Sequence, residues 1–368
     1  MKRDASKETA RSTTPARSLY DNAPFIVFWE LTQACDLACR HCRACAVPER
    51  DARELTTEQG KELLASVAEM GTPLVVLTGG DPAKRPDLLE LVRHGVSLGL
   101  RMALTPSATP LVTRDLLTEL RDAGLARLAV SLDGASRGLH DGFRGVNGSH
   151  ARTFEILRTA RELGMTTQVN TSITRFNKHE LPAIADNLVE LEIELWGVFF
   201  VVPTGRGVNE ICLDADEVES VLEWLATIAE RRDFDVKTTA APHFRRVLLT
   251  RKFQRTDIVG LRDGIGRAAR GVNDGQGVVF VSHLGEVSPS GFLPIPCGNV
   301  KERPLPSIYR EHAVFQALRE PDRLGGKCGV CEFRKVCGGS RARAHSVHGD
   351  MLAEDPSCAY VPQSLRPS

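Results

Sequence analysis

The chain alternates apolar strand-like runs with helix-like segments between residues 25 and 202, and this alternation limits the folds open to it. Strands are predicted at 25–31, 74–77, 101–105, 127–132, 166–173 and 195–202. Helical periodicity lies between them, at 57–70, 86–98, 114–123, 153–163 and 178–191. Repeated strand–helix units predict a parallel sheet with right-handed crossovers. Six units are too few for a closed eight-unit barrel, so we predict an α/β fold built on a partial (β/α)6 TIM-like barrel.

The chain of 368 residues is longer than one core usually organises, so a second lobe is expected. We predict a disordered tail at 1–20, the barrel at 21–235, a linker or substrate-covering segment at 236–276 and a small second lobe at 277–368. The second lobe is predicted to open with a hairpin from residue 277 and to continue with a helix at 307–319.

Charge and hydropathy narrow the range of partners. The formal net charge is zero and no long block of like charge occurs, which predicts neither a nucleic-acid nor a membrane-surface partner. The longest apolar run, 195–202, is far below the roughly 18 residues of a membrane span. The amino terminus lacks the apolar stretch of a secretory signal. Ten cysteines in metal-like spacings then indicate reduced thiols and a cytoplasmic location.

Three cysteines directly follow the first predicted strand. Cys35, Cys39 and Cys42 lie on a short loop, so their thiolates can converge on one metal centre. A cubane iron–sulfur cluster usually takes four cysteines, and three would leave one iron open. A structural zinc site or a redox pair remains an alternative, because Cys-x-x-Cys spacing, which also relates Cys42 to Cys45, occurs in both.

A second set of cysteines lies near the carboxyl end of the chain: Cys328, Cys331, Cys337 and Cys358. Four thiolates would complete a metal cage with no open position. Zinc takes the same number of ligands, so spacing alone does not name the metal. Cys45, Cys212 and Cys297 are left without an assigned partner.

Both cysteine sets resemble signatures of one enzyme superfamily. The first loop is similar to the Cys-x-x-x-Cys-x-aromatic-Cys loop of radical S-adenosylmethionine enzymes, with His41 at the aromatic position. The second set resembles the auxiliary-cluster domain of the SPASM group, also called SPASM/twitch-like, although Ser290 and Arg341 stand where further cysteines are expected. The resemblance covers roughly residues 24–362. It implies a 4Fe-4S cluster that binds S-adenosylmethionine and one auxiliary 4Fe-4S cluster.

The resemblance also assigns cofactor contacts to polar residues at successive strand ends. These residues are His41, Gly79, Gly80, Asp81, Ser107, Thr109, Ser131, Asp133 and Asn170. The Gly-Gly backbone is expected to receive the amino group of S-adenosylmethionine, while Asp81 stands where glutamate is common. The hydroxyls after the third strand suit the methionine carboxylate, and the later residues suit the ribose. Ordinary turn chemistry or satisfaction of buried backbone groups would explain each residue equally well.

The wording of several segments, such as Thr-Gly-Gly-Asp-Pro and Pro-Thr-Gly-Arg-Gly, is most similar to the branch acting in alternative haem and haem d1 biosynthesis. That branch implies oxidative modification of a tetrapyrrole side chain, for example loss of propionate carboxyl groups. The candidate substrate residues are Arg206, His243, Arg245, Arg341 and Arg343. Each of these arginines could instead be an ordinary solvated surface residue, since most arginines lie at the surface.

Two other functions stay open. Many SPASM proteins mature ribosomal peptides, but only about twenty residues precede the first predicted strand, which leaves no room there for a leader-recognition domain. A non-catalytic iron–sulfur electron carrier would explain the cysteines, but not an open ligand position beside a Gly-Gly-Asp turn. The predicted partners are a reducing electron donor of the ferredoxin or flavodoxin type and a small-molecule or peptide substrate.

Overall fold

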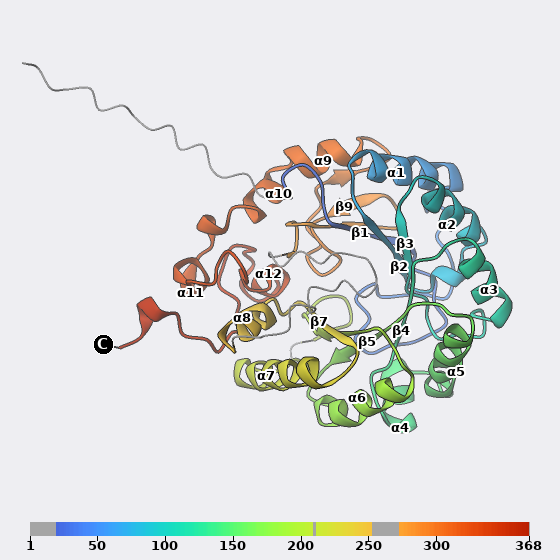
Figure 1. Ribbon diagram of the computed structural model, residues 1–368. Helices are drawn as coiled ribbons and strands as arrows, with labels where there is room; N and C mark the ends of the chain where they lie inside the picture. The colour runs from blue at the N-terminus through green and yellow to red at the C-terminus, as the bar shows by residue number, and fades with distance from the viewer. Residues whose placement is uncertain (1–19, 209–210, 252–271, 368) are drawn as a thin grey trace, which may run out of the picture.

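The computed structural model describes residues 20–208, 211–251 and 272–367, and its strands there form one sheet (Figure 1). The order across the sheet is β10-β9-β8-β1-β2-β3-β4-β5-β6-β7. The strands are β1 (Ile26–Thr32), β2 (Leu74–Gly79), β3 (Arg101–Leu104), β4 (Arg127–Ser131), β5 (Thr167–Ile173), β6 (Leu195–Phe200), β7 (Asp235–Thr239), β8 (Val278–Val281), β9 (Glu286–Ser288) and β10 (Gly298–Asn299).

The strands from β1 to β7 pair in parallel and in chain order, which confirms the predicted partial barrel. The count of six strands was one too low. A seventh strand, β7, pairs in parallel with β6, for example Leu195 with Asp235. Because all seven strands run the same way, their carboxyl ends meet at one edge of the sheet, where active sites of such folds form.

Helices cover the outer face of the curved sheet, as Figure 1 shows for α1, α2, α3, α5, α6 and α7. The helices are α1 (Thr57–Glu69), α2 (Leu88–Ser97), α3 (Arg114–Asp122), α4 (Arg137–Arg144), α5 (Ser149–Glu162), α6 (Leu181–Glu190), α7 (Ala215–Arg231), α8 (His243–Thr250), α9 (Leu305–Glu311), α10 (Ala313–Leu318), α11 (Gly326–Val330) and α12 (Arg341–His348). Capping boxes at Thr56 and Asp214 begin α1 and α7 and satisfy amide groups that a helix start leaves free.

The main hydrophobic core lies between the sheet and these helices. Alternate residues of β1 point into it, and Val27, Trp29 and Leu31 are fully buried there. The intervening residues face the inside of the arc, where Ile26 and Phe28 join a much smaller apolar cluster. The inner face is therefore free for polar side chains toward the carboxyl ends of the strands.

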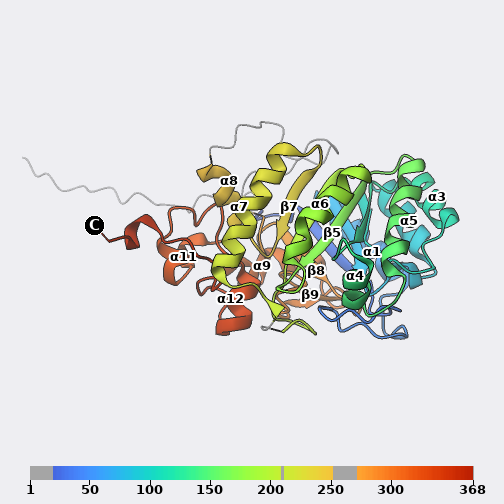
Figure 2. The ribbon, with the colours of Figure 1, turned by 90° about the horizontal axis from the view of Figure 1, so that it is seen from below.

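The segment predicted as a second lobe, 277–368, continues the barrel sheet through β8, β9 and β10. The predicted hairpin is present, since β8 and β9 pair antiparallel, but β8 also pairs in parallel with β1. The helix predicted at 307–319 is two helices, because His312 adopts an extended conformation and caps α10. Figures 1 and 2 show α11 and α12 beside the β7 and α8 side of the arc.

Two predicted segments fall partly outside the described residues. Of the tail at 1–20, only Tyr20 is described; it is buried, and its carbonyl accepts a hydrogen bond from the Tyr309 hydroxyl at 2.8 Å. Of the segment at 236–276, residues 236–251 and 272–276 are described, and they include the end of β7 and all of α8. No helix in the described ranges is long and apolar enough to cross a membrane.

Truncation of Leu104 tests the packing between sheet and helices. Leu104 on β3 is fully buried in the main core. We expect Leu104→Ala to lower the free energy of unfolding by about 2–5 kcal/mol, because it removes buried methyl groups and leaves a cavity. Leu249→Ala on α8 is the matched control. Because Leu249 is 55% exposed, this change should alter the free energy of unfolding little. Urea unfolding measures both; equal effects would contradict this placement of the core.

Candidate functional site

The first cysteine loop lies at the carboxyl edge of the sheet and is held there by neighbouring loops. Cys35, Cys39 and Cys42 belong to one small cluster, in which Cys35 and Cys39 are buried and Cys42 is half-buried. The amide of Ala38 donates to the carbonyl of Arg144 at 3.1 Å, so the end of α4 supports the middle of the loop. The structure thus brings the three predicted thiols together.

Arg144 connects this loop to a fully buried carboxylate. Its Nη1 donates to Cys39 Sγ at 3.7 Å, and its Nη2 forms an ion pair with Asp133. The other oxygen of Asp133 accepts from the Ser172 amide at 2.7 Å. The carboxylate of Asp133, which was predicted to contact the ribose, therefore forms an ion pair with Arg144. Sequence reasoning missed Arg144 because no cysteine spacing or strand-end pattern marks α4.

His41, at the aromatic position of the loop, packs as an aromatic ring. It stacks on Phe143 with ring centres 4.3 Å apart and planes 18° from parallel. Burial, together with the nearby cations of Arg144 and Arg206, holds the pKa of His41 well below its usual value. The imidazole is therefore neutral and braces the loop by stacking.

The Gly-Gly turn after β2 presses directly on the end of β1. The amides of Gly80 and Asp81 donate to the carbonyls of Thr32 and Ala34 at 2.8 and 2.7 Å. A Cβ on Gly79 would lie 2.3 Å from the Thr32 oxygen, and one on Gly80 would lie 2.5 Å from the Ala34 oxygen. Both glycines are thus required for backbone to approach backbone, beside any ligand they receive.

Asp81 ties the next loop to this turn. Its fully buried carboxylate accepts from the Ser107 amide at 3.2 Å and from the Thr109 hydroxyl at 2.7 Å. The Ser107 hydroxyl donates to the Gly80 carbonyl at 2.9 Å and lies 3.2 Å from Cys35 Sγ. The structure brings these predicted residues together. The side chains of Asp81 and Thr109 hydrogen-bond to each other, whereas Ser107 contacts Cys35, a predicted cluster ligand.

Ser131 and Asn170 stand opposite each other on β4 and β5. Asn170 pairs in turn with Gly197 on β6, and a Cβ there would lie 2.7 Å from the Asn170 side-chain oxygen. Gln168 donates to that same oxygen at 2.6 Å. Both predicted residues are partly exposed toward the inside of the arc. This row can therefore face a ligand bound in front of the cysteine loop.

The second set of cysteines lines one cavity together with His243 and Tyr360. Burial raises the pKa of Cys337 to about 12, whereas the pKa of Cys358 is lowered because contact with His243 outweighs the effect of its burial. Within the described residues, no three His, Cys, Asp or Glu side chains converge on a single metal ion.

Comparison with known proteins decides the family. Residues 29–188 match the model of the Radical SAM superfamily. The chain is 39% identical to the AdoMet-dependent heme synthase of Methanosarcina barkeri, over 93% of this chain and 98% of that protein. It is 36% identical to the AdoMet-dependent heme synthase of Nitratidesulfovibrio vulgaris, over 95% and 97% of the two chains.

The chain belongs to the radical SAM superfamily. It is therefore an enzyme that uses a 4Fe-4S cluster and S-adenosylmethionine and requires a reductant. The solved structure of Streptococcus suis SuiB bound to S-adenosylmethionine has the same fold, with a TM-score of 0.72 at 16% identity, over 92% of this chain and 78% of that one. SuiB bound to its precursor peptide SuiA matches with the same score, over 92% and 76%.

Four of the five predicted substrate residues of this radical SAM enzyme lie near the second cysteine set, where three are buried and Arg245 is half-buried. Arg245 donates to the carbonyls of Val336 and Val272 at 3.3 and 2.6 Å. His243, Arg341 and Arg343 are each at most 3% exposed. Arg341 and Arg343 donate to backbone carbonyls, and His243 Nε2 lies 3.1 Å from the carboxylate of Asp355, so these side chains lie beside the second cysteine set.

Arg206 is the exception. Its loop follows β6 and rests on the cysteine loop, where the Arg206 amide donates to the Cys42 carbonyl at 3.0 Å. Gly205 makes this approach possible, since it has φ +59° and a Cβ there would lie 2.3 Å from the Arg43 oxygen. Nε and Nη2 of Arg206 are buried without a hydrogen-bond partner among the described residues. Its guanidinium is thus positioned to receive an anion.

The remaining cysteines differ in their surroundings. Cys297 is packed in the main core, and burial raises its pKa to about 12. Cys212 donates to the carbonyls of Val201 and Val208 at 3.5 Å, and Cys45 is exposed on the first loop. Cys297 therefore acts as a small apolar side chain.

An added methyl group at Gly80 tests the role of the Gly-Gly turn. Gly80→Ala forces the turn away from the first cysteine loop, because the new Cβ would meet two carbonyl oxygens at 2.5 Å. We expect a loss of about 1–3 kcal/mol in stability and less iron retained by the reconstituted protein. Thermal unfolding and iron per chain measure these effects. Gly142→Ala on α4, where nothing lies within 4 Å, is the control; a Gly80 variant that matches it would refute this role.

Proposed function

We propose that this radical SAM enzyme oxidatively decarboxylates propionate side chains of a haem precursor. The observation that carries the proposal is the 39% identity to a protein named AdoMet-dependent heme synthase over 98% of that protein. The Fe-coproporphyrin III synthase of the same organism, at 31% identity over 94% of this chain, also has a tetrapyrrole in its name. The alignment with the heme synthase covers 93% of this chain, so it extends over both cysteine sets.

The overall change is simple to balance. Each propionate loses one hydrogen atom, one molecule of carbon dioxide and one electron, and a vinyl group remains. When bound, the cluster and S-adenosylmethionine supply the radical chemistry that removes hydrogen from the unreactive carbon. The electron left on the substrate needs an acceptor, and a second iron–sulfur cluster is an acceptor of the right class. The chain itself has to hold the cofactors, orient the propionate and exclude water.

The proposed roles follow the geometry. Cys35, Cys39 and Cys42 hold the first cluster, and the S-adenosylmethionine contacts come from the backbone at Gly79 and Gly80 and from Ser107, Ser131 and Asn170. Cys328, Cys331, Cys337 and Cys358 hold the auxiliary cluster. Asp81, Thr109 and Asp133 position these groups through the hydrogen bonds and ion pair described above. Arg206 binds a propionate carboxylate, for which the planar guanidinium fork is well suited.

We further propose a reductant of the ferredoxin or flavodoxin type and a cytoplasmic location. All ten cysteines of the chain lie in the described ranges and are free thiols there. Free thiols in metal-like spacings are typical of a reducing compartment.

Removal of the first cysteine set tests the cluster assignment. Replacement of Cys35, Cys39 and Cys42 by Ala should abolish formation of 5′-deoxyadenosine under reducing conditions. The reconstituted variant should keep about four irons per chain, as one remaining cubane requires. Nucleoside chromatography and iron analysis measure both. Near-zero iron in a folded variant would contradict the auxiliary site, and nucleoside formation by the variant would contradict the first site.

The substrate proposal is tested with Fe-coproporphyrin and the Arg206→Gln variant. We expect the reconstituted enzyme to lower the mass of the porphyrin by loss of carbon dioxide and hydrogen. Arg206→Gln should raise the KM for porphyrin about ten- to a hundredfold, because it removes one charge-assisted pair. Arg114→Gln, at a site where Arg114 is 59% exposed and pairs with Glu162, is the matched control. An unchanged KM for Arg206→Gln would contradict its role.

Peptide maturation is the competing outcome. Its structural support is the likeness to peptide-bound SuiB, which at this identity shows the fold alone. Incubation with candidate precursor peptides, followed by mass spectrometry, separates the two functions. Modification of a peptide without turnover of Fe-coproporphyrin would overturn the tetrapyrrole proposal.

A further inference from the structure

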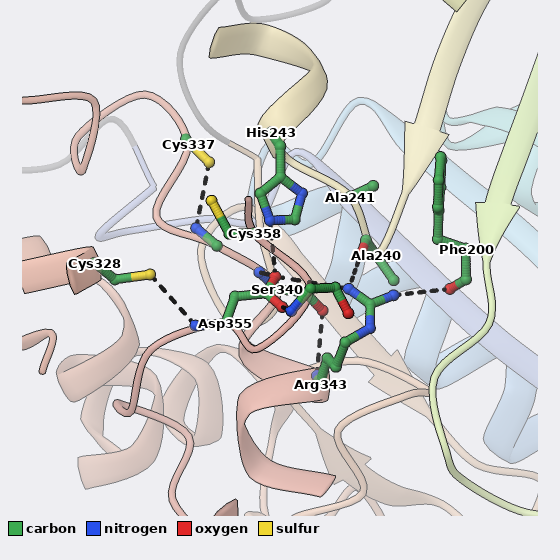
Figure 3. A network of polar contacts seen from close by, with 12 residues as sticks. Phe200, Ala240, Ala241, His243, Cys328, Cys337, Ser340, Arg343, Asp355 and Cys358 are labelled. Carbon is green, nitrogen blue, oxygen red and sulfur yellow. Dashed lines mark hydrogen bonds and ion pairs between the residues drawn. The ribbon is translucent and has the colours of Figure 1, made fainter. Parts of the chain in front are cut away.

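Asp355 links the segments that carry three cysteines of the second set (Figure 3). It is fully buried and stands three residues before Cys358. Its Oδ2 accepts from the Ser340 amide at 2.6 Å, its Oδ1 accepts from the Ser357 amide at 3.0 Å, and its own amide lies 3.4 Å from Cys328 Sγ. One residue therefore orients the loops around Cys328 and Cys358 and the turn that follows Cys337.

The barrel supplies the partner of this carboxylate. His243 begins α8, directly after β7, and its Nε2 lies 3.1 Å from Asp355 Oδ2 with both side chains at most 1% exposed. Figure 3 shows the imidazole beside both the Asp355 carboxylate and Cys358. His243 and Cys358 also line the same cavity. A residue of α8 thus reaches the wall of a site whose cysteines all lie between residues 328 and 358.

Two arginines of α12 complete the surroundings. Arg341 places Nη2 at 3.7 Å from Cys328 Sγ and is held by the carbonyls of Met351 and Ala353 at 3.0 and 2.7 Å. Arg343 donates to the carbonyl of Ala240 at 2.9 Å, at the end of β7, and lies 3.6 Å from Asp355. These contacts explain why the side chains are buried although they are cationic: each guanidinium donates hydrogen bonds to backbone carbonyls.

We propose that His243, Asp355 and Arg341 form an outer shell around the auxiliary cluster, with His243 contributed by α8. The proposal rests on the assignment of Cys328, Cys331, Cys337 and Cys358 as cluster ligands. Asp355 is a positioning residue for the ligand loops, and His243 and Arg341 place donors next to two ligand sulfurs. Hydrogen bonds and positive charge at cluster sulfurs favour the reduced cluster, so His243 and Arg341 raise its reduction potential.

The test uses the full chain reconstituted anaerobically, with Cys35, Cys39 and Cys42 replaced by Ala so that only the auxiliary cluster contributes. We expect His243→Gln to keep the cluster but to shift its midpoint potential, followed by electron paramagnetic resonance, to a lower value. Asp355→Asn should lose most of the remaining iron, because the ligand loops are no longer held. His348→Gln and Asp322→Asn, which change exposed side chains, are the matched controls.

Each outcome decides a different point. Full iron and an unchanged potential in both His243→Gln and Asp355→Asn would overturn the outer shell. If Asp355→Asn fails to fold by circular dichroism, the potential of His243→Gln alone decides the matter. Retention of all iron when Cys328, Cys331, Cys337 and Cys358 are replaced would instead refute the ligand assignment on which the shell rests.

Discussion

The contact between the end of β1 and the turn after β2 is the constraint on which the first site depends. The carbonyls of Thr32 and Ala34 accept the amides of Gly80 and Asp81, so the start of the cysteine loop is fixed to the sheet. Asp81 then binds the loop after β3 through Thr109. Three consecutive elements of the carboxyl edge thereby move as one unit. The protein itself thus positions the start of the cysteine loop, which reduces the ordering cost of loading a cluster.

The same loop is also connected to the second lobe. Arg43, directly after Cys42, forms an ion pair with the buried Glu30 at 2.5 Å and lies over the ring of Phe280 on β8, 4.6 Å from its centre. His283, just beyond β8, contacts the other oxygen of Glu30 at 2.8 Å. Because β8 pairs with β1, Glu30 on β1 and Phe280 on β8 belong to one continuous sheet, and Arg43 joins the cysteine loop to both of these strands.

The parts of this structure that follow local rules could be predicted from the sequence. Strand and helix periodicity predicted the repeated units, and cysteine spacing predicted two sets of cluster ligands. The parallel pairing of β8 with β1 could not be predicted, because it joins residues about 250 positions apart and depends on the completed arc. The same holds for His243 and Arg341. The sequence identifies a positively charged side chain, but only the tertiary structure shows whether the hydrogen-bond donors of that side chain already have partners in the protein.

Arg206 differs from the other candidate arginines in the hydrogen-bond donors that the protein leaves without a partner among the described residues. A buried donor without a partner costs about 1–3 kcal/mol, so folded proteins rarely leave two on one side chain. Arg245, Arg341 and Arg343 avoid the cost through backbone carbonyls, whereas Nε and Nη2 of Arg206 do not. The proposed cofactor contacts come from the loops after β2 and β3 and from the strands β4 and β5. Arg206 follows β6, beyond all of them, and a carboxylate of the substrate would supply the partner that the protein leaves out.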